Sequence, residues 1–178
     1  MITQAFSARS SNWMANARLA EGMRGLDDYG TSGRVQALAD AKEAFREAVE
    51  IDPRFRNAHF HLAITRELAG EHEGAIAEFE GLLDETAAVP PSELLYNLGL
   101  AWFHLYHRGA YERALGYFDR AIAATQPRHA DAIVERRTRL IRLLAKVGKA
   151  QVHAHQMLPE TCLAAAQAAE AAESARSE

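Results

Sequence analysis

Apolar residues recur along most of this chain at spacings of three and four, which places side chains on one face of an α-helix. The pattern is clearest in three segments in which an alanine is followed, four positions on, by a phenylalanine. These segments begin at Ala41, Ala75 and Ala114. Long runs of Val, Ile and Thr, which favour strands, are absent, so the pattern predicts an all-α protein.

Each Ala–Phe segment is preceded by another amphipathic stretch, so the chain is expected to form pairs of helices. The clearest pair has a first helix over 94–105 and a second over 111–122. Gly70 and Gly109 are expected to end first helices, because glycine adopts a left-handed C-cap without strain. Pro53 and other prolines are expected to stop second helices.

The first helix of the first pair is less clear in the sequence. We place it over about 12–26, and we expect the polar and glycine-containing stretch 27–34 to form a loop. The side chains that this placement turns inward are Leu19, Ala20, Met23 and Leu26.

The chain resembles the tetratricopeptide repeat (TPR) family in these pairs. The first two Ala–Phe segments are 34 residues apart, which is the period of that helix hairpin. The second pair departs from the family pattern at His59 and Arg66, where aromatic residues are preferred, and at Leu82. The third pair matches by residue type at Leu98, Gly99, Trp102, Ala114, Phe118 and Ala121.

The resemblance implies a right-handed superhelix of antiparallel helix hairpins with a C-terminal capping helix. An Ala-rich helix is expected to follow the cap, either docked or mobile, because such a helix is marginal alone. The expected boundaries are about 12–53, 56–86 and 92–126 for the three hairpins, 128–150 for the cap and 159–176 for the Ala-rich helix.

First helices line the concave groove in this family, so the resemblance implies a binding module for a peptide or protein segment, with an adaptor or scaffold role. Aromatic anchors would supply most of the affinity, and amides would orient the peptide. The same apolar residues could instead pack against a neighbouring helix. The groove candidates are Asn57, Phe60, His61, Ile64, Glu67, Glu93, Tyr96, Asn97, Leu100, Phe103 and His104.

Composition and charge narrow the protein class. The 178 residues are 48% hydrophobic and 25% charged, which is typical of a folded domain, and the net charge of -4 is too small to indicate a nucleic-acid binder. The single cysteine, Cys162, fits a reducing compartment. With neither a signal-peptide pattern nor an apolar stretch of about 20 residues, we expect a cytoplasmic protein without a membrane span.

Catalytic and metal-binding patterns are missing from the sequence. It has no Gly-x-Ser-x-Gly, no phosphate-binding glycine loop and no His-Glu-x-x-His. The eight histidines and Cys162 do not show the spacing of a structural zinc site. We therefore expect no enzyme activity, no metal and no cofactor.

Two alternative functions remain open. Arg139, Arg142, Lys146 and Lys149 share one face of the basic stretch 136–149, which could dock an acidic protein or nucleic acid. Aromatic residues that stack on bases are absent there, which argues against nucleic acid, and a solvated outer face explains the charges equally.

The second alternative is a structural scaffold that associates with copies of itself. A homodimer would then form through the Ala-rich helix, with Leu163 and Ala164 to Ala172 in the interface.

Overall fold

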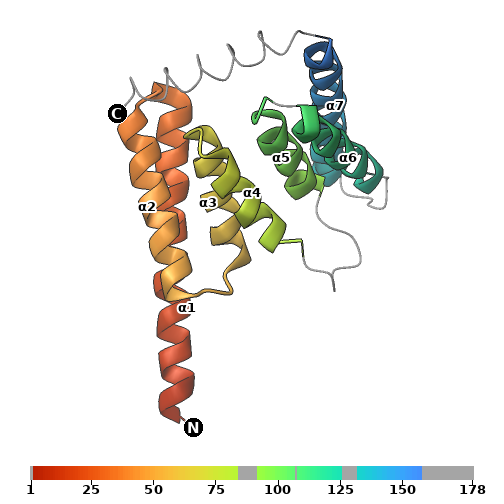
Figure 1. Ribbon diagram of the computed structural model, residues 1–178. Coiled ribbons are helices and arrows are strands. Elements are labelled where there is room, and N and C mark those ends of the chain that lie inside the picture. The colour runs from red at the N-terminus through yellow and green to blue at the C-terminus, as the bar shows by residue number, and fades with distance from the viewer. Residues whose placement is uncertain (1, 84–91, 107, 126–131, 158–178) are drawn as a thin grey trace. The chain divides into compact units, whose positions relative to one another are not determined.

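A computed structural model describes residues 2–83, 92–106, 108–125 and 132–157 (Figure 1). Within these ranges every regular element is an α-helix, which confirms the all-α prediction. The described residues up to Glu78 form one compact unit, and those from Phe79 form a second. The helices are α1 (Ile2–Ser32), α2 (Val35–Ile51), α3 (Arg56–Leu68), α4 (His72–Gly81), α5 (Ser92–Phe103), α6 (Arg108–Ala124) and α7 (Ala132–Gln156).

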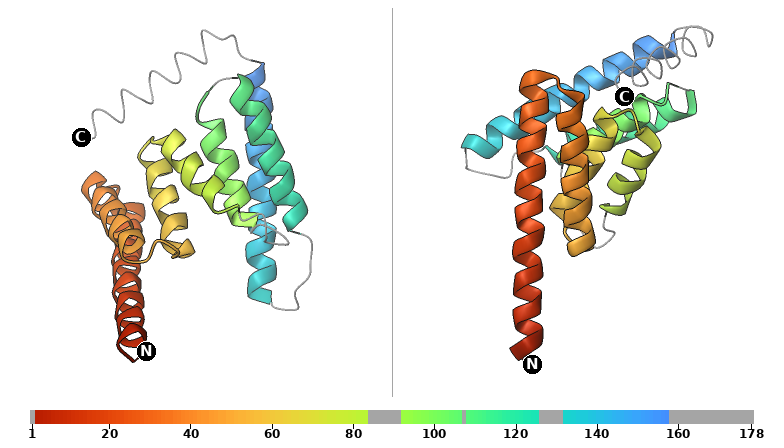
Figure 2. Two further views of the ribbon diagram at one scale, coloured as in Figure 1. Left: turned by 60° about the horizontal axis from the view of Figure 1, so that its bottom comes forward. Right: turned by 90° about the vertical axis from the view of Figure 1, so that its left-hand side faces the viewer.

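The first unit is organised around the ring of Phe45. Helices α1 and α2 lie antiparallel and side by side, and α2 also packs against α3 (Figure 2). Phe45, on α2, is fully buried. A Cβ atom built on Gly22 of α1 would lie 2.5 Å from the Phe45 ring, while the His61 ring of α3 stacks on Phe45 at 5.4 Å between centroids. The absence of a side chain at Gly22 therefore lets α1 approach α2 closely.

This close approach sets a different register for α1 from the expected one. Ala20 and Met23 were expected to face inward, but both are exposed. Gly22 takes the position facing Phe45 because a larger side chain would overlap the ring. The residues of α1 turned toward its neighbours are Ala15, Leu19, Gly22 and Leu26.

The expected loop over 27–34 is also wrong, because α1 continues to Ser32. The hydroxyl groups of Thr31 and Ser32 donate to backbone carbonyl oxygens four residues earlier, at 3.0 and 2.7 Å. These bonds let polar residues that often favour turns remain helical. Gly33 follows the last residue of α1, and its φ of 67° is the left-handed conformation of a C-cap.

The glycine predicted to end a first helix does so after α3 but not after α5. Gly70 has a φ of 78° just after α3, as expected. Gly109 was expected to end the next first helix, but it lies inside α6. The left-handed residue there is Tyr106, with a φ of 50°. A non-glycine residue in that region carries backbone strain, and the Tyr106 ring lies 5.9 Å from the Phe103 ring between centroids.

The second unit repeats the phenylalanine arrangement with α5, α6 and α7. Phe118, on α6, is fully buried, and α7 packs against both other helices. A Cβ atom on Gly99 of α5 would lie 2.7 Å from the Phe118 ring, and one on Gly148 of α7 would lie 2.6 Å from it. Phe118 thus lies between two glycines, and α7 continues past the expected end at 150 to Gln156.

We predict that Gly99→Ala lowers the free energy of unfolding by about 1–3 kcal/mol, because the added methyl group overlaps the Phe118 ring. Gly116→Ala is the matched control, since Gly116 lies exposed on α6 with no atom within 4 Å of its added Cβ. This control should raise stability by about 0.5–1 kcal/mol through helix propensity. Urea unfolding measures both, and equal stability of the two variants would contradict the packing described.

Candidate functional site

The groove candidates on α3 belong to the first unit and differ in their roles. Asn57 is exposed, and Phe60, His61 and Ile64 are half-buried. His61 stacks on Phe45, so its ring belongs largely to the packing of α3 on α2. The Phe60 ring lies edge-on to the ring of its neighbour His61, with centroids 5.5 Å apart.

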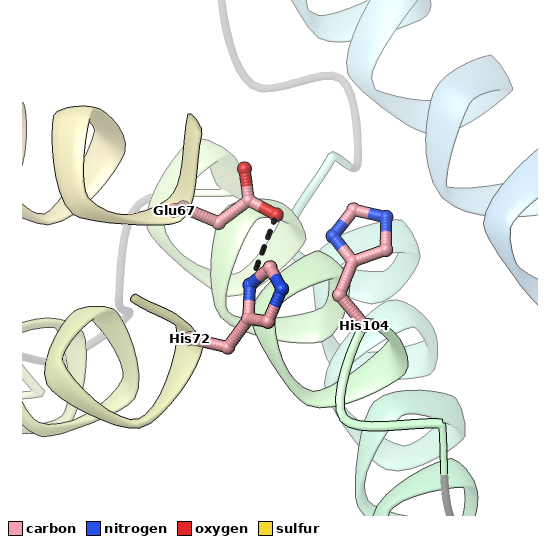
Figure 3. Close-up of side chains that lie close together, drawn as sticks. All are labelled: Glu67, His72 and His104. Carbon is pink, nitrogen blue, oxygen red and sulfur yellow. Dashed lines mark ion pairs between the residues drawn. The ribbon is translucent and has the colours of Figure 1, made fainter. Parts of the chain in front are cut away.

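Glu67, at the end of α3, lies beside His72 at the start of α4 (Figure 3). The His72 Nδ1 atom is 3.9 Å from the Glu67 Oε1 atom, and the His72 side chain is largely buried. The pair joins the two ends of one turn. Glu67 therefore has a structural partner within its own unit as well as its expected place on the first-helix face.

Two departures from the repeat pattern, His59 and Arg66, share one partner in the first unit. The Nδ1 atom of His59 lies 2.8 Å from a carboxylate oxygen of Glu78, on α4. The guanidinium of Arg66 lies 3.6 Å from the other Glu78 oxygen and also covers Gly74. A polar network through Glu78 thus joins α3 to α4.

The groove candidates on α5 belong to the second unit. Tyr96 and Leu100 are half-buried against its core, and the Tyr96 ring lies 6.0 Å from Phe118. Asn97, also half-buried, donates from its amide nitrogen to the Glu93 carbonyl oxygen at 2.9 Å. Glu93 is half-buried as well. This part of α5 therefore carries an aromatic, an aliphatic and an amide side chain that are all half-buried.

Phe103 does not lie on that face, contrary to its expected role as a groove anchor. Its side chain is only 5% exposed, because it lies at the centre of an aromatic cluster. The rings of Tyr106, Tyr111 and His155 surround it at centroid distances of 5.9, 5.8 and 5.0 Å. His104, half-buried, lies at the edge of this cluster, 5.3 Å from Phe103.

Tyr111 is fully buried in the cluster, and its hydroxyl group has no hydrogen-bond partner among the described residues. Burial raises the pKa of the Tyr111 hydroxyl, because the phenolate anion is less stable away from water.

The predicted basic face is only partly available to a partner. The Nε atom of Arg142 donates to the Thr125 hydroxyl at 2.9 Å, and the guanidinium also donates to the Thr125 carbonyl oxygen. Lys149 pairs with Asp119 of α6. Both side chains therefore hold α7 on α6, whereas Arg139 and Lys146 are exposed.

The structure also exposes apolar residues that the sequence reasoning did not select. Trp13 and Met14, on α1, are 72% and 50% exposed. The signal was present, because neither residue falls in the inward register that runs through Ala15 and Leu19. The Ala-rich helix over 159–176, including Leu163 and Ala164 to Ala172, lies outside the described residues.

Comparison with known proteins adds no relative: the chain matches no protein-family model, and no curated protein matches it significantly. In the described part of the chain, no helix combines the length and the apolar character needed to cross a membrane.

Tyr111→Phe is predicted to raise the free energy of unfolding by about 1 kcal/mol at pH 7, because it removes a buried hydroxyl without a partner. The raised pKa adds a pH dependence. Below the unfolded pKa of about 10, the stability of wild type does not change with the ionisation of Tyr111. As the pH rises from there through the folded pKa, the unfolded state loses this proton first and wild type loses stability, which the variant does not.

Urea unfolding at neutral and alkaline pH, with tyrosinate absorbance, checks this prediction. Tyr117→Phe is the control, since Tyr117 donates to Glu80 at 3.3 Å and its removal should bring no gain at pH 7. A Tyr111→Phe variant less stable than wild type would mean that the hydroxyl has a partner.

Arg142→Ala is predicted to cost about 1–2 kcal/mol of stability, because it leaves buried polar groups of Thr125 without their donor. Lys146→Ala, an exposed position on the same helix, should change stability by less than about 0.5 kcal/mol. Thermal unfolding of the two variants measures the difference, and equal effects would argue that Arg142 is not a packing residue.

Proposed function

We propose that this chain is a TPR-like module that binds an extended or helical segment of another protein, with an adaptor or scaffold role. The proposal includes the right-handed superhelical arrangement of hairpins and a cytoplasmic location, which the single cysteine favours. It includes no reaction.

One observation carries the proposal: α3 and α5 each present an aromatic and an aliphatic side chain four residues apart on a partly exposed face. The pairs are Phe60 with Ile64 and Tyr96 with Leu100. Residues four apart lie one above the other on a helix, so each pair makes one continuous apolar contact area. Such areas are typical of surfaces that bind protein segments.

The cores support these pairs by limiting the freedom of their aromatic members. Phe60 is held edge-on by His61, and Tyr96 lies against Phe118. Side chains that are already ordered lose less entropy when a partner binds, so they are better anchors than mobile ones.

Asn97 adds a polar group suited to a peptide backbone. Its amide nitrogen donates to Glu93 within the helix, and this bond fixes the orientation of the side chain. The amide oxygen can then accept a hydrogen bond from a backbone N–H of the bound segment. Asn57 offers a comparable amide on the exposed start of α3.

The two alternatives have less support. On the basic face, Arg142 contacts Thr125 and Lys149 pairs with Asp119, so part of the charge of this face is already paired within the unit. Self-association through the Ala-rich helix concerns residues outside the described ranges, and it can coexist with segment binding.

The test is quantitative affinity capture with two double variants, Phe60→Ser/Ile64→Ser and Tyr96→Ser/Leu100→Ser. Each should weaken binding of the captured partner by more than about tenfold, because anchors of this kind contribute about 2 kcal/mol or more. Phe103 is not used, because its burial would confuse loss of binding with loss of folding.

The matched control is Val35→Ser/Leu68→Ser, which changes two exposed apolar residues elsewhere in the first unit. It should bind like wild type, and circular dichroism should show that all variants remain folded. Partner retention by both groove variants would reject the proposal, as would equal loss in the control.

A further inference from the structure

Helix α6 carries two arginines over aromatic rings, on a surface that the segment-binding proposal does not use. The Cζ atom of Arg113 lies 4.4 Å from the centroid of the Trp102 ring, which belongs to α5. The Cζ atom of Arg120 lies 5.2 Å from the centroid of the Tyr117 ring, on α6 itself. A guanidinium group over a ring is attracted to the aromatic face and keeps its N–H donors at its edges. The α6 arginine face consists of Arg113, Tyr117 and Arg120.

The two arginines share one side of α6 and have no carboxylate partner among the described residues. Steps of four and three separate the members of the face, so all three lie on the same side of the helix. Both arginine side chains are exposed. Glu112 and Asp119 each precede an arginine by one residue, which turns them about 100° away around the helix, and Asp119 pairs with Lys149. Both guanidinium groups therefore keep hydrogen-bond donors for a ligand.

One acidic side chain, Glu80, reaches this face. The Tyr117 hydroxyl donates to a Glu80 carboxylate oxygen at 3.3 Å. Burial and the Glu80 charge raise the pKa of the Tyr117 hydroxyl, while the charges of Arg120 and Arg113 act on it in the opposite direction. Both guanidinium groups are thus close to Tyr117, where two positive charges oppose one negative charge. The face therefore attracts anions, with part of its charge offset by Glu80.

We propose that the α6 arginine face binds an acidic helical segment of another protein, with one carboxylate on each guanidinium group. Arginine and carboxylate form paired, charge-assisted hydrogen bonds, and an arginine already ordered over a ring loses less entropy on binding. Seven residues separate the two arginines, which is about 10 Å along the helix axis. Two acidic residues seven apart on the partner helix have the same spacing and share one face.

The aromatic rings of this face favour a protein segment over nucleic acid. Proteins that bind single strands stack bases on aromatic side chains. Here Trp102 and Tyr117 are half-buried against the core, and each ring is covered by a guanidinium group. A continuous phosphate backbone would also pass close to Glu80 and Glu112, whereas two separated carboxylates can contact the arginines alone.

Fluorescence anisotropy with a labelled peptide and the full chain tests the proposal. The peptide is an alanine-based helix with glutamates seven residues apart, and the buffer is low in salt because exposed charges are strongly screened. Arg113→Gln/Arg120→Gln should weaken binding at least about tenfold, because it removes two charge-assisted pairs. The same peptide with glutamine in place of glutamate should bind wild type with a similar loss.

The matched control is Arg139→Gln/Lys146→Gln, which removes the same charge from exposed positions of the second unit on α7. It should bind the peptide within about twofold of wild type. An equal loss in the two double variants would overturn the proposal, since net charge alone would then determine binding. Absence of binding to wild type would also overturn it, and tighter binding of an oligothymidylate of equal charge would do so in favour of nucleic acid.

A second pair of variants tests the site without removing either arginine. Gly116→Glu places a carboxylate three residues after Arg113 and four before Arg120, a spacing at which charges pair along a helix. It should bind the peptide at least about fivefold more weakly than Gly116→Gln, which adds similar bulk without charge. Both should keep the helical circular dichroism of wild type, because no atom lies within 4 Å of a Cβ at Gly116. Equal affinities of the two folded variants would contradict a carboxylate site between these arginines.

Discussion

The contact on which each unit depends is a phenylalanine ring held where two neighbouring helices come closest. In the second unit, Phe118 lies between Gly99 and Gly148, and a single methyl group on either glycine would overlap the ring. In the first unit, Phe45 lies between Gly22 and the stacked ring of His61. Tight interior packing makes these contacts intolerant of added volume, so they fix the register of the helices around them.

The candidate binding faces are consequences of this packing. The Tyr96 ring lies against Phe118, and the Phe60 ring lies edge-on to His61, which stacks on Phe45. A change in either core would therefore move a surface residue without touching it. Phe103 is also inside the second unit, where the rings of Tyr106, Tyr111 and His155 lie around it.

Polar residues show how the two units differ in detail. His59 and Arg66 depart from the repeat pattern, and they reach the shared carboxylate of Glu78. On α7, Arg142 and Lys149 hold that helix to α6 rather than facing a ligand. In both cases charged side chains join helices, so charge alone is a poor guide to a binding site here.

The sequence by itself determined the helical class, the repeated Ala–Phe segments and the left-handed turn at Gly70, because each depends on residues close in the chain. It also placed Phe60, Ile64, Tyr96 and Leu100 outside the core positions of their helices, and these four side chains are half-buried. Only the tertiary structure decided that Gly22 faces α2, that Phe103 is buried, and that Arg142 is committed to Thr125. These outcomes depend on which neighbouring helix meets each side chain, and local spacing does not specify that neighbour.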